Sequence, residues 1–151
     1  MRAVLAPLLI AALLVPLATG CGAEEDRLPT GCTNGADGVR AALHAAPGRV
    51  RVDGMPLSAC LDNSRADASE LQTVGVAFVE AAVPLARLAA RRPEGRAALE
   101  LGYLMGASSR GASSQVGVHA ELVRRLRQEL TGVNVAAAAF RRGELAGRRN
   151  G

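Results

Sequence analysis

Three cysteines, Cys21, Cys32 and Cys60, are the residues of this 151-residue chain with the most distinctive chemistry. A thiol can be acylated, can pair in a disulfide or can ligate a metal, and its surroundings decide among these fates. Metal ligation is the weakest of the three, because no cysteine belongs to a CxxC pair and the only histidines are His44 and His119. We therefore expect no metal site.

Other catalytic chemistry has little support in the sequence. The chain has no GxSxG, HExxH, Walker A or EF-hand pattern, and no GxGxxG follows a predicted strand. His44 is predicted to be an exposed helix residue, and His119 is predicted to pack at the edge of the core beside Val116 and Val123. With its arginine neighbours His119 is still the best candidate for an enzyme site. We expect no catalytic residues and no cofactor.

Four carboxylates could gather into an acidic patch: Asp53, Asp62, Asp67 and Glu70. Such a patch is a weak indication of cation binding. Surface carboxylates are more often simply solvated, and solvation is the reading that we favour.

The N-terminus has the layout of an export signal. Arg2 is followed by an apolar run of 15 residues, 3–17, that is broken only by Pro7 and Pro16. A bilayer span usually needs about 20 apolar residues, so this run is short for a span and suits a signal peptide.

The end of the run, Leu17-Ala18-Thr19-Gly20-Cys21, resembles the lipobox of bacterial lipoprotein precursors. The resemblance implies that Cys21 receives a diacylglyceryl group and that signal peptidase II cleaves between Gly20 and Cys21, which removes residues 1–20. The mature protein would then be lipid-anchored on the extracytoplasmic face of the cell membrane. The class usually has Leu where this chain has Ala18, and Ala18-Thr19-Gly20 would also suit the ordinary signal peptidase, whose product is a soluble secreted protein.

The cysteine count favours the lipid reading. If Cys21 carries lipid, Cys32 and Cys60 are left to form a disulfide in an oxidising compartment. Closing a loop of about 29 residues stabilises the fold by roughly 3 to 4 kcal/mol. An unmodified Cys21 would leave one free thiol outside the cell.

The charge is uneven along the chain, and every basic residue is arginine. Residues 21–70 contain 5 arginines and 8 acidic residues, whereas residues 71–151 contain 12 and 6. Nucleic acid is an improbable partner for an exported protein with one Tyr, two Phe and no Trp. Anionic lipid headgroups are the better counter-surface. A solvated helix face with pairs such as Glu121 with Arg125, and Arg125 with Glu129, is favoured over both.

For the mature chain, the sequence predicts a polar tether over 21–31, one mainly α-helical domain over 32–147 and a disordered tail over 148–151. We expect a bundle of four or five helices with a short, disulfide-tied extended segment near its N-terminus. The predicted elements begin with a helix over 34–46 and an edge strand or loop over 49–57. A helix over 67–91 follows, with a Ser69-x-x-Gln72 capping box and an internal Pro84. A third helix is predicted with Pro93 in its first turn, and a last helix over 134–140.

Residues 94–131 are either one helix or two helices that meet near Gly111. Small residues recur along one face of this stretch and predict a close approach of two helix axes: Gly102, Gly106, Ser109, Ser113 and Gly117.

The expected function is a membrane-anchored extracytoplasmic binding or envelope-interaction module. Its partner would be an envelope protein or anionic lipid headgroups. A soluble secreted protein, a structural envelope component and an unrecognised enzyme are the alternatives. A binding module would expose an apolar groove, whereas a structural protein would present a featureless polar surface.

Overall fold

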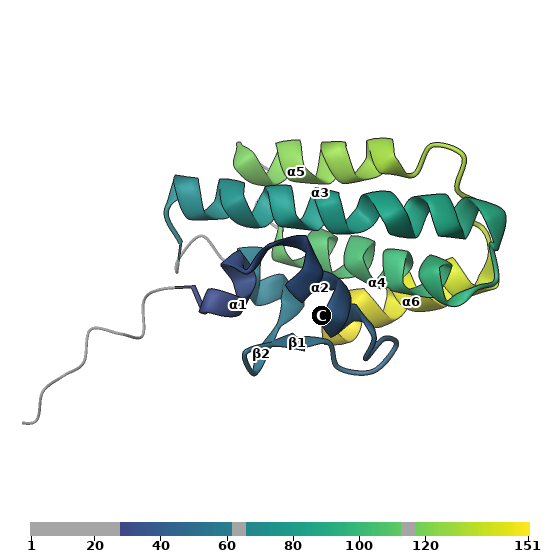
Figure 1. Cartoon of the computed structure of the whole chain (residues 1–151), viewed down its shortest axis with the longest axis horizontal. Coiled ribbons are helices and arrows are strands. Elements are labelled where there is room, and N and C mark those ends of the chain that lie inside the picture. The colour runs from purple at the N-terminus through teal and green to yellow at the C-terminus, as the bar shows by residue number, and fades with distance from the viewer. Residues whose placement is uncertain (1–27, 62–65, 113–116) are drawn as a thin grey trace, which may run out of the picture.

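The computed structural model describes residues 28–61, 66–112 and 117–151. The predicted signal peptide, Cys21, most of the tether and Asp62, Ser113 and Val116 lie outside these ranges. The described chain is mainly α-helical, as predicted (Figure 1). Its elements are α1 (Thr30–Thr33), α2 (Gly35–Leu43), β1 (Arg51–Val52), β2 (Met55–Pro56), the 3-10 helix η1 (Leu57–Leu61), α3 (Ala68–Arg91), α4 (Arg96–Gly111), α5 (Val118–Glu129) and α6 (Ala138–Asn150).

The N-terminal segment is tied to the bundle by the predicted disulfide, which joins Cys32 in α1 to Cys60 in η1. Between them β1 and β2 form a two-residue antiparallel ladder, and Asp53 and Gly54 make the turn with positive φ angles of 47° and 80°. The Asp53 carboxylate accepts a 2.7 Å hydrogen bond from the Gly31 amide. The predicted tether therefore ends earlier than residue 31, because α1 already begins at Thr30.

The long helix α3 follows the predicted range. Its capping box uses Asp67 and Glu70 rather than Ser69 and Gln72, because the Asp67 carboxylate accepts from the Ser69 and Glu70 amides. The helix continues past Pro84 to Arg91. Its length and composition would also suit a membrane span, but half of its most apolar window is buried inside the protein. The three- and four-residue spacing of apolar residues in this helix predicts that Leu88 belongs to the core, but 46% of its surface is exposed.

Residues 94–131 form two helices, α4 and α5. Pro93 precedes α4 rather than sitting in its first turn, since the helix begins at Arg96 after an extended Gly95. All residues of α4 from Ala98 to Ser108 are buried, so this helix is the centre of the bundle. Its end at Gly111 fits tightly against η1: a β-carbon there would lie 2.4 Å from the Ser58 carbonyl oxygen.

The last helix, α6, differs from two predictions, one for its range and one for the C-terminal tail. It covers Ala138–Asn150 rather than 134–140, and Asn134 accepts from the Ala136 amide in a turn before it. Residues 148–150 are helical, and Gly151, which was predicted to fray, is buried and accepts a 2.6 Å hydrogen bond from Ser58. The physical reason is that α6 packs along α4 through glycines on both helices.

Candidate functional site

The histidines were the first candidates for chemistry, and the structure places them apart. His119 is 5% exposed, and its Nε2 lies 2.7 Å from the Leu61 carbonyl oxygen. It packs at the edge of the core, as predicted. His119 is not among the residues that line the groove between α3 and α5 or the groove between α4, α5 and α6.

His44 forms a cluster that the sequence reading missed. The buried Glu100 carboxylate oxygen Oε1 lies 3.0 Å from His44 Nδ1 and accepts a 2.8 Å hydrogen bond from Arg96 Nε. Arg96 also donates to the His44 carbonyl oxygen. The i, i+4 spacing of Arg96 and Glu100 was the only signal in the sequence. These contacts tie the end of α2 to α4.

The acidic residues cap helices rather than converge. Asp53 accepts hydrogen bonds from Thr30 and Gly31 at the start of α1, and Asp67 with Glu70 caps α3. Within residues 28–61, 66–112 and 117–151, no three His, Cys, Asp or Glu side chains are grouped to hold a metal ion.

The small-residue face is an internal contact of α4 at Gly102 and Gly106, whereas Ser109 lines an open groove and Gly117 is exposed before α5. A β-carbon on Gly102 or Gly106 would lie 2.1 Å from a carbonyl oxygen of α6, that of Phe140 or Glu144. The predicted close approach of two helices is therefore confirmed for these two positions. The glycines of α6 that complete the contact were not identified from the sequence.

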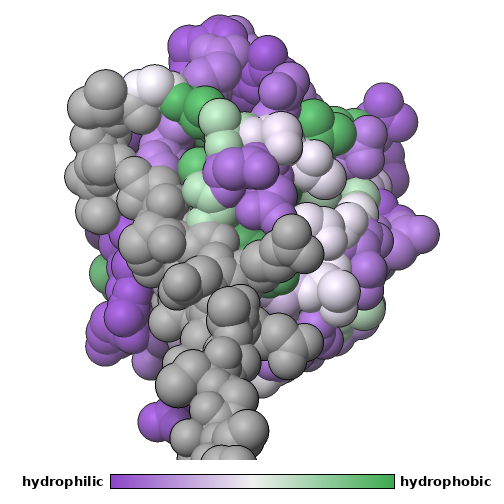
Figure 2. Space-filling view, turned by 90° about the vertical axis from the view of Figure 1, so that its left-hand side faces the viewer, coloured by the Kyte–Doolittle hydropathy of each residue, from purple (hydrophilic) through white to green (hydrophobic). Residues whose placement is uncertain are grey.

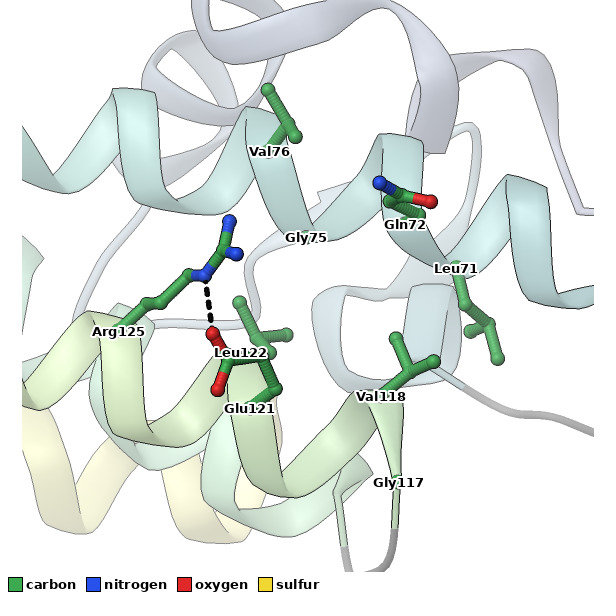
Figure 3. A pocket seen from close by; sticks show the side chains of 9 residues that line it. All are labelled: Leu71, Gln72, Gly75, Val76, Gly117, Val118, Glu121, Leu122 and Arg125. Carbon is green, nitrogen blue, oxygen red and sulfur yellow. Dashed lines mark hydrogen bonds and ion pairs between the residues drawn. The ribbon is translucent and has the colours of Figure 1, made fainter.

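An open groove with a mainly apolar lining lies between α3 and α5 (Figure 3). Its volume is about 290 Å³, and it is lined by Leu71, Gln72, Gly75, Val76, Gly117, Val118, Glu121, Leu122 and Arg125. Val76 and Val118 are 45% and 39% exposed on its two walls. The groove exists partly because Gly75 has no side chain: a β-carbon there would meet only Leu122, at 3.7 Å.

The two charged residues that line this groove, Glu121 and Arg125, form an ion pair. Glu121 accepts hydrogen bonds of 2.7 to 2.8 Å from Arg124 and Arg125 (Figure 3 shows the Arg125 contact). These hydrogen bonds lower the pKa of Glu121 to about 2. The predicted Glu121–Arg125 pair is thus present. Because the carboxylate and its partners are mutually satisfied, the groove favours an uncharged, apolar ligand group.

Figure 2 shows the end of the molecule at which α3 and α5 begin, where hydrophobic residues are flanked by hydrophilic ones. Comparison of the chain with protein families, with curated proteins and with solved structures found no match.

Proposed function

We propose that this chain is an exported bacterial lipoprotein, held on the extracytoplasmic face of the membrane by lipid on Cys21, and that its helical domain is a binding module. The observation that carries the proposal is the Cys32–Cys60 disulfide. It uses two of the three cysteines and is typical of an oxidising compartment. Cys21, at the end of the lipobox-like sequence, is the one cysteine left for acylation.

The α3/α5 groove is the binding surface in this proposal. Its exposed valines and the floor at Gly75 and Leu122 fit an apolar segment of an envelope protein. Binding is preferred over catalysis because the ionisable groups at this groove, Glu121 and Arg125, are paired with each other.

The anchor is tested by fractionation of cells that express the full chain. We expect the wild-type protein in the membrane fraction and Cys21→Ser in the soluble fraction or as uncleaved precursor. The matched control is Cys32→Ser with Cys60→Ser, which removes two thiols and should stay membrane-bound. A wild-type protein that is fully soluble would instead support the ordinary signal peptidase and a secreted product.

The groove is tested by placing a photo-crosslinking residue at Val118 in cells. Leu88 is the control position, since it is at least as exposed as Val118 (46% against 39%) but does not line this groove. We expect a discrete cross-linked species from position 118 that is lost when Gly75→Leu fills the groove. Equal cross-linking from both positions, unaffected by Gly75→Leu, would contradict a role for the groove.

A further inference from the structure

A second groove, between α4, α5 and α6, differs in charge from the first. It has a volume of about 400 Å³, within the ~300–1,000 Å³ range of small-molecule pockets. Its lining combines apolar side chains with arginines: Met105, Ser109, Arg127, Leu130, Val135, Ala136, Phe140, Arg141, Glu144 and Arg148.

The groove is lined by more arginines than acidic residues. Arg148 pairs with Glu144 at 2.6 Å. Arg127 on α5 and Arg141 on α6 form no ion pair with any other described residue. Two guanidinium groups from different helices thus border one concave surface without a carboxylate to neutralise them. Guanidinium groups bind phosphate oxygens well because they present several donors in a fixed plane.

The floor of the same groove is apolar. Phe140 and Met105 are buried beneath it, and Val135 is 45% exposed beside the arginines. A free phosphate would leave this apolar surface in water. A ligand with both an anionic head and an alkyl chain would satisfy the arginines and cover the apolar side chains together.

We infer that this groove binds one anionic phospholipid, with the phosphate between Arg127 and Arg141 and an acyl chain along Leu130, Val135 and Phe140. The inference deepens the proposed function, because it depends on a membrane location for a supply of lipid. It also names a site for anionic headgroups, which the arginine-rich second half of the sequence left open as a partner behind a solvated helix face.

Native mass spectrometry of the full chain in mild detergent tests the inference. The added probes are phosphatidylglycerol, phosphatidylcholine with the same acyl chains, and inorganic phosphate. We expect a single saturable phosphatidylglycerol adduct, much weaker binding of phosphatidylcholine and no competition from phosphate. Equal binding of the two lipids, or displacement by phosphate, would overturn the inference.

Matched variants identify the site. Each arginine near an anionic lipid surface contributes about fivefold in affinity, so Arg127→Gln with Arg141→Gln should weaken the adduct about 25-fold. The control, Arg142→Gln with Arg149→Gln, makes the same change in net charge outside the groove. It should change the affinity for phosphatidylglycerol less than twofold. An equal loss of affinity in the two double variants would mean that the lipid is attracted by net charge alone, and it would contradict a specific site.

An apolar variant provides a second test that does not remove an arginine. Val135→Asp should abolish the adduct, whereas Leu88→Asp, at an equally exposed position elsewhere, should not. Circular dichroism melting confirms that each variant is folded. The native mass spectra also report whether Cys21 is acylated, so failure of the anchor proposal is distinguished from failure of lipid binding.

Discussion

The α-carbon of Gly102 lies directly against the carbonyl oxygen of Phe140, and a β-carbon on Gly102 would stand 2.1 Å from that oxygen. The contact is reciprocal: a β-carbon on Gly143 would lie 2.0 Å from the Leu99 carbonyl oxygen, and one on Gly147 would lie 2.2 Å from that of Tyr103. Backbone therefore packs on backbone along α4 and α6. A chain rich in alanine and poor in aromatic residues gains a dense core in this way.

The first prediction concerns these glycines. Gly102→Ala should destabilise the fold by about 3 kcal/mol, because the added methyl overlaps backbone that cannot move aside. Gly75→Ala is the matched control: its methyl meets only Leu122 at 3.7 Å, so the gain in helix propensity should stabilise the fold by about 1 kcal/mol. Urea unfolding of both variants measures the difference. Equal effects of the two substitutions would contradict the backbone contact.

The sequence showed only half of this helix pair. The spacing of Gly102 and Gly106 indicated a close helix contact, but a sequence pattern does not say which segment fills it. The tail was predicted to fray, because each Gly costs about 1 kcal/mol in an exposed helix and Gly143, Gly147 and Gly151 recur there. Tertiary packing reverses that effect here, and so α6 continues through residues that propensity alone assigns to a frayed tail.

The second prediction concerns the start of α6. The Glu94 carboxylate accepts 3.0 Å hydrogen bonds from the Ala138 and Ala139 amides, while Arg110 donates to the Arg148 and Arg149 carbonyl oxygens at the other end. The negative charge of Glu94 at the N-terminus of α6 and the positive charge of Arg110 at its C-terminus also interact favourably with the helix dipole.

Glu94→Ala should therefore cost about 1 kcal/mol in unfolding free energy, as loss of a helix cap does. Glu80→Ala, an exposed glutamate within α3, should change stability by less than about 0.5 kcal/mol. Thermal melting of the two variants makes the comparison. This cap was invisible in the sequence because Glu94 and Ala138 are separated by 44 residues.

The third prediction concerns the chain's single tyrosine. The buried Tyr103 hydroxyl accepts a 3.1 Å hydrogen bond from the Val50 amide, and Tyr103→Phe would leave that amide without an acceptor. We expect a loss of about 1 to 3 kcal/mol in unfolding free energy. An unchanged stability in urea unfolding would show that the hydrogen bond contributes nothing.

The same residue sets the alkaline limit of stability. Burial raises the pKa of Tyr103 above its ordinary value of 10.0, against smaller lowering effects of the Val50 amide and Arg110. The unfolded chain therefore loses this proton first, and stability should fall as the pH rises from about 10 through the folded-state pKa. Tyr103→Phe should remove this dependence, and the chain has no lysine to mask it. Tyrosinate absorbance during alkaline unfolding follows the step directly.

The fourth prediction concerns the disulfide. Cys32 and Cys60 are separated by 28 positions and are fully buried, so their pairing restricts a sizeable loop of the unfolded chain. Cys32→Ser with Cys60→Ser should cost about 3 to 4 kcal/mol. Unfolding with and without reductant measures the effect. Reductant that leaves the wild-type midpoint unchanged would mean that the bond does not form in the purified protein.

The grooves mark the limit of what the sequence could give. The periodicity of apolar residues identified Leu71, Phe78 and Leu126 as core positions, and the cysteine count predicted the disulfide. Whether Val76 and Val118 line one groove depends on how α3 and α5 pack, which no local pattern encodes. In the same way, Arg127 and Arg141 line one groove only because of how α5 and α6 are placed.

The central claim is that Cys21 carries the membrane anchor. Mass spectrometry of the N-terminal peptide of the membrane-purified protein tests it most directly. We expect a mature chain that begins at Cys21 with diacylglyceryl on its thiol, and no such mass from Cys21→Ser. A mature chain that begins with an unmodified Cys21, or that retains residues 1–20, would contradict the claim.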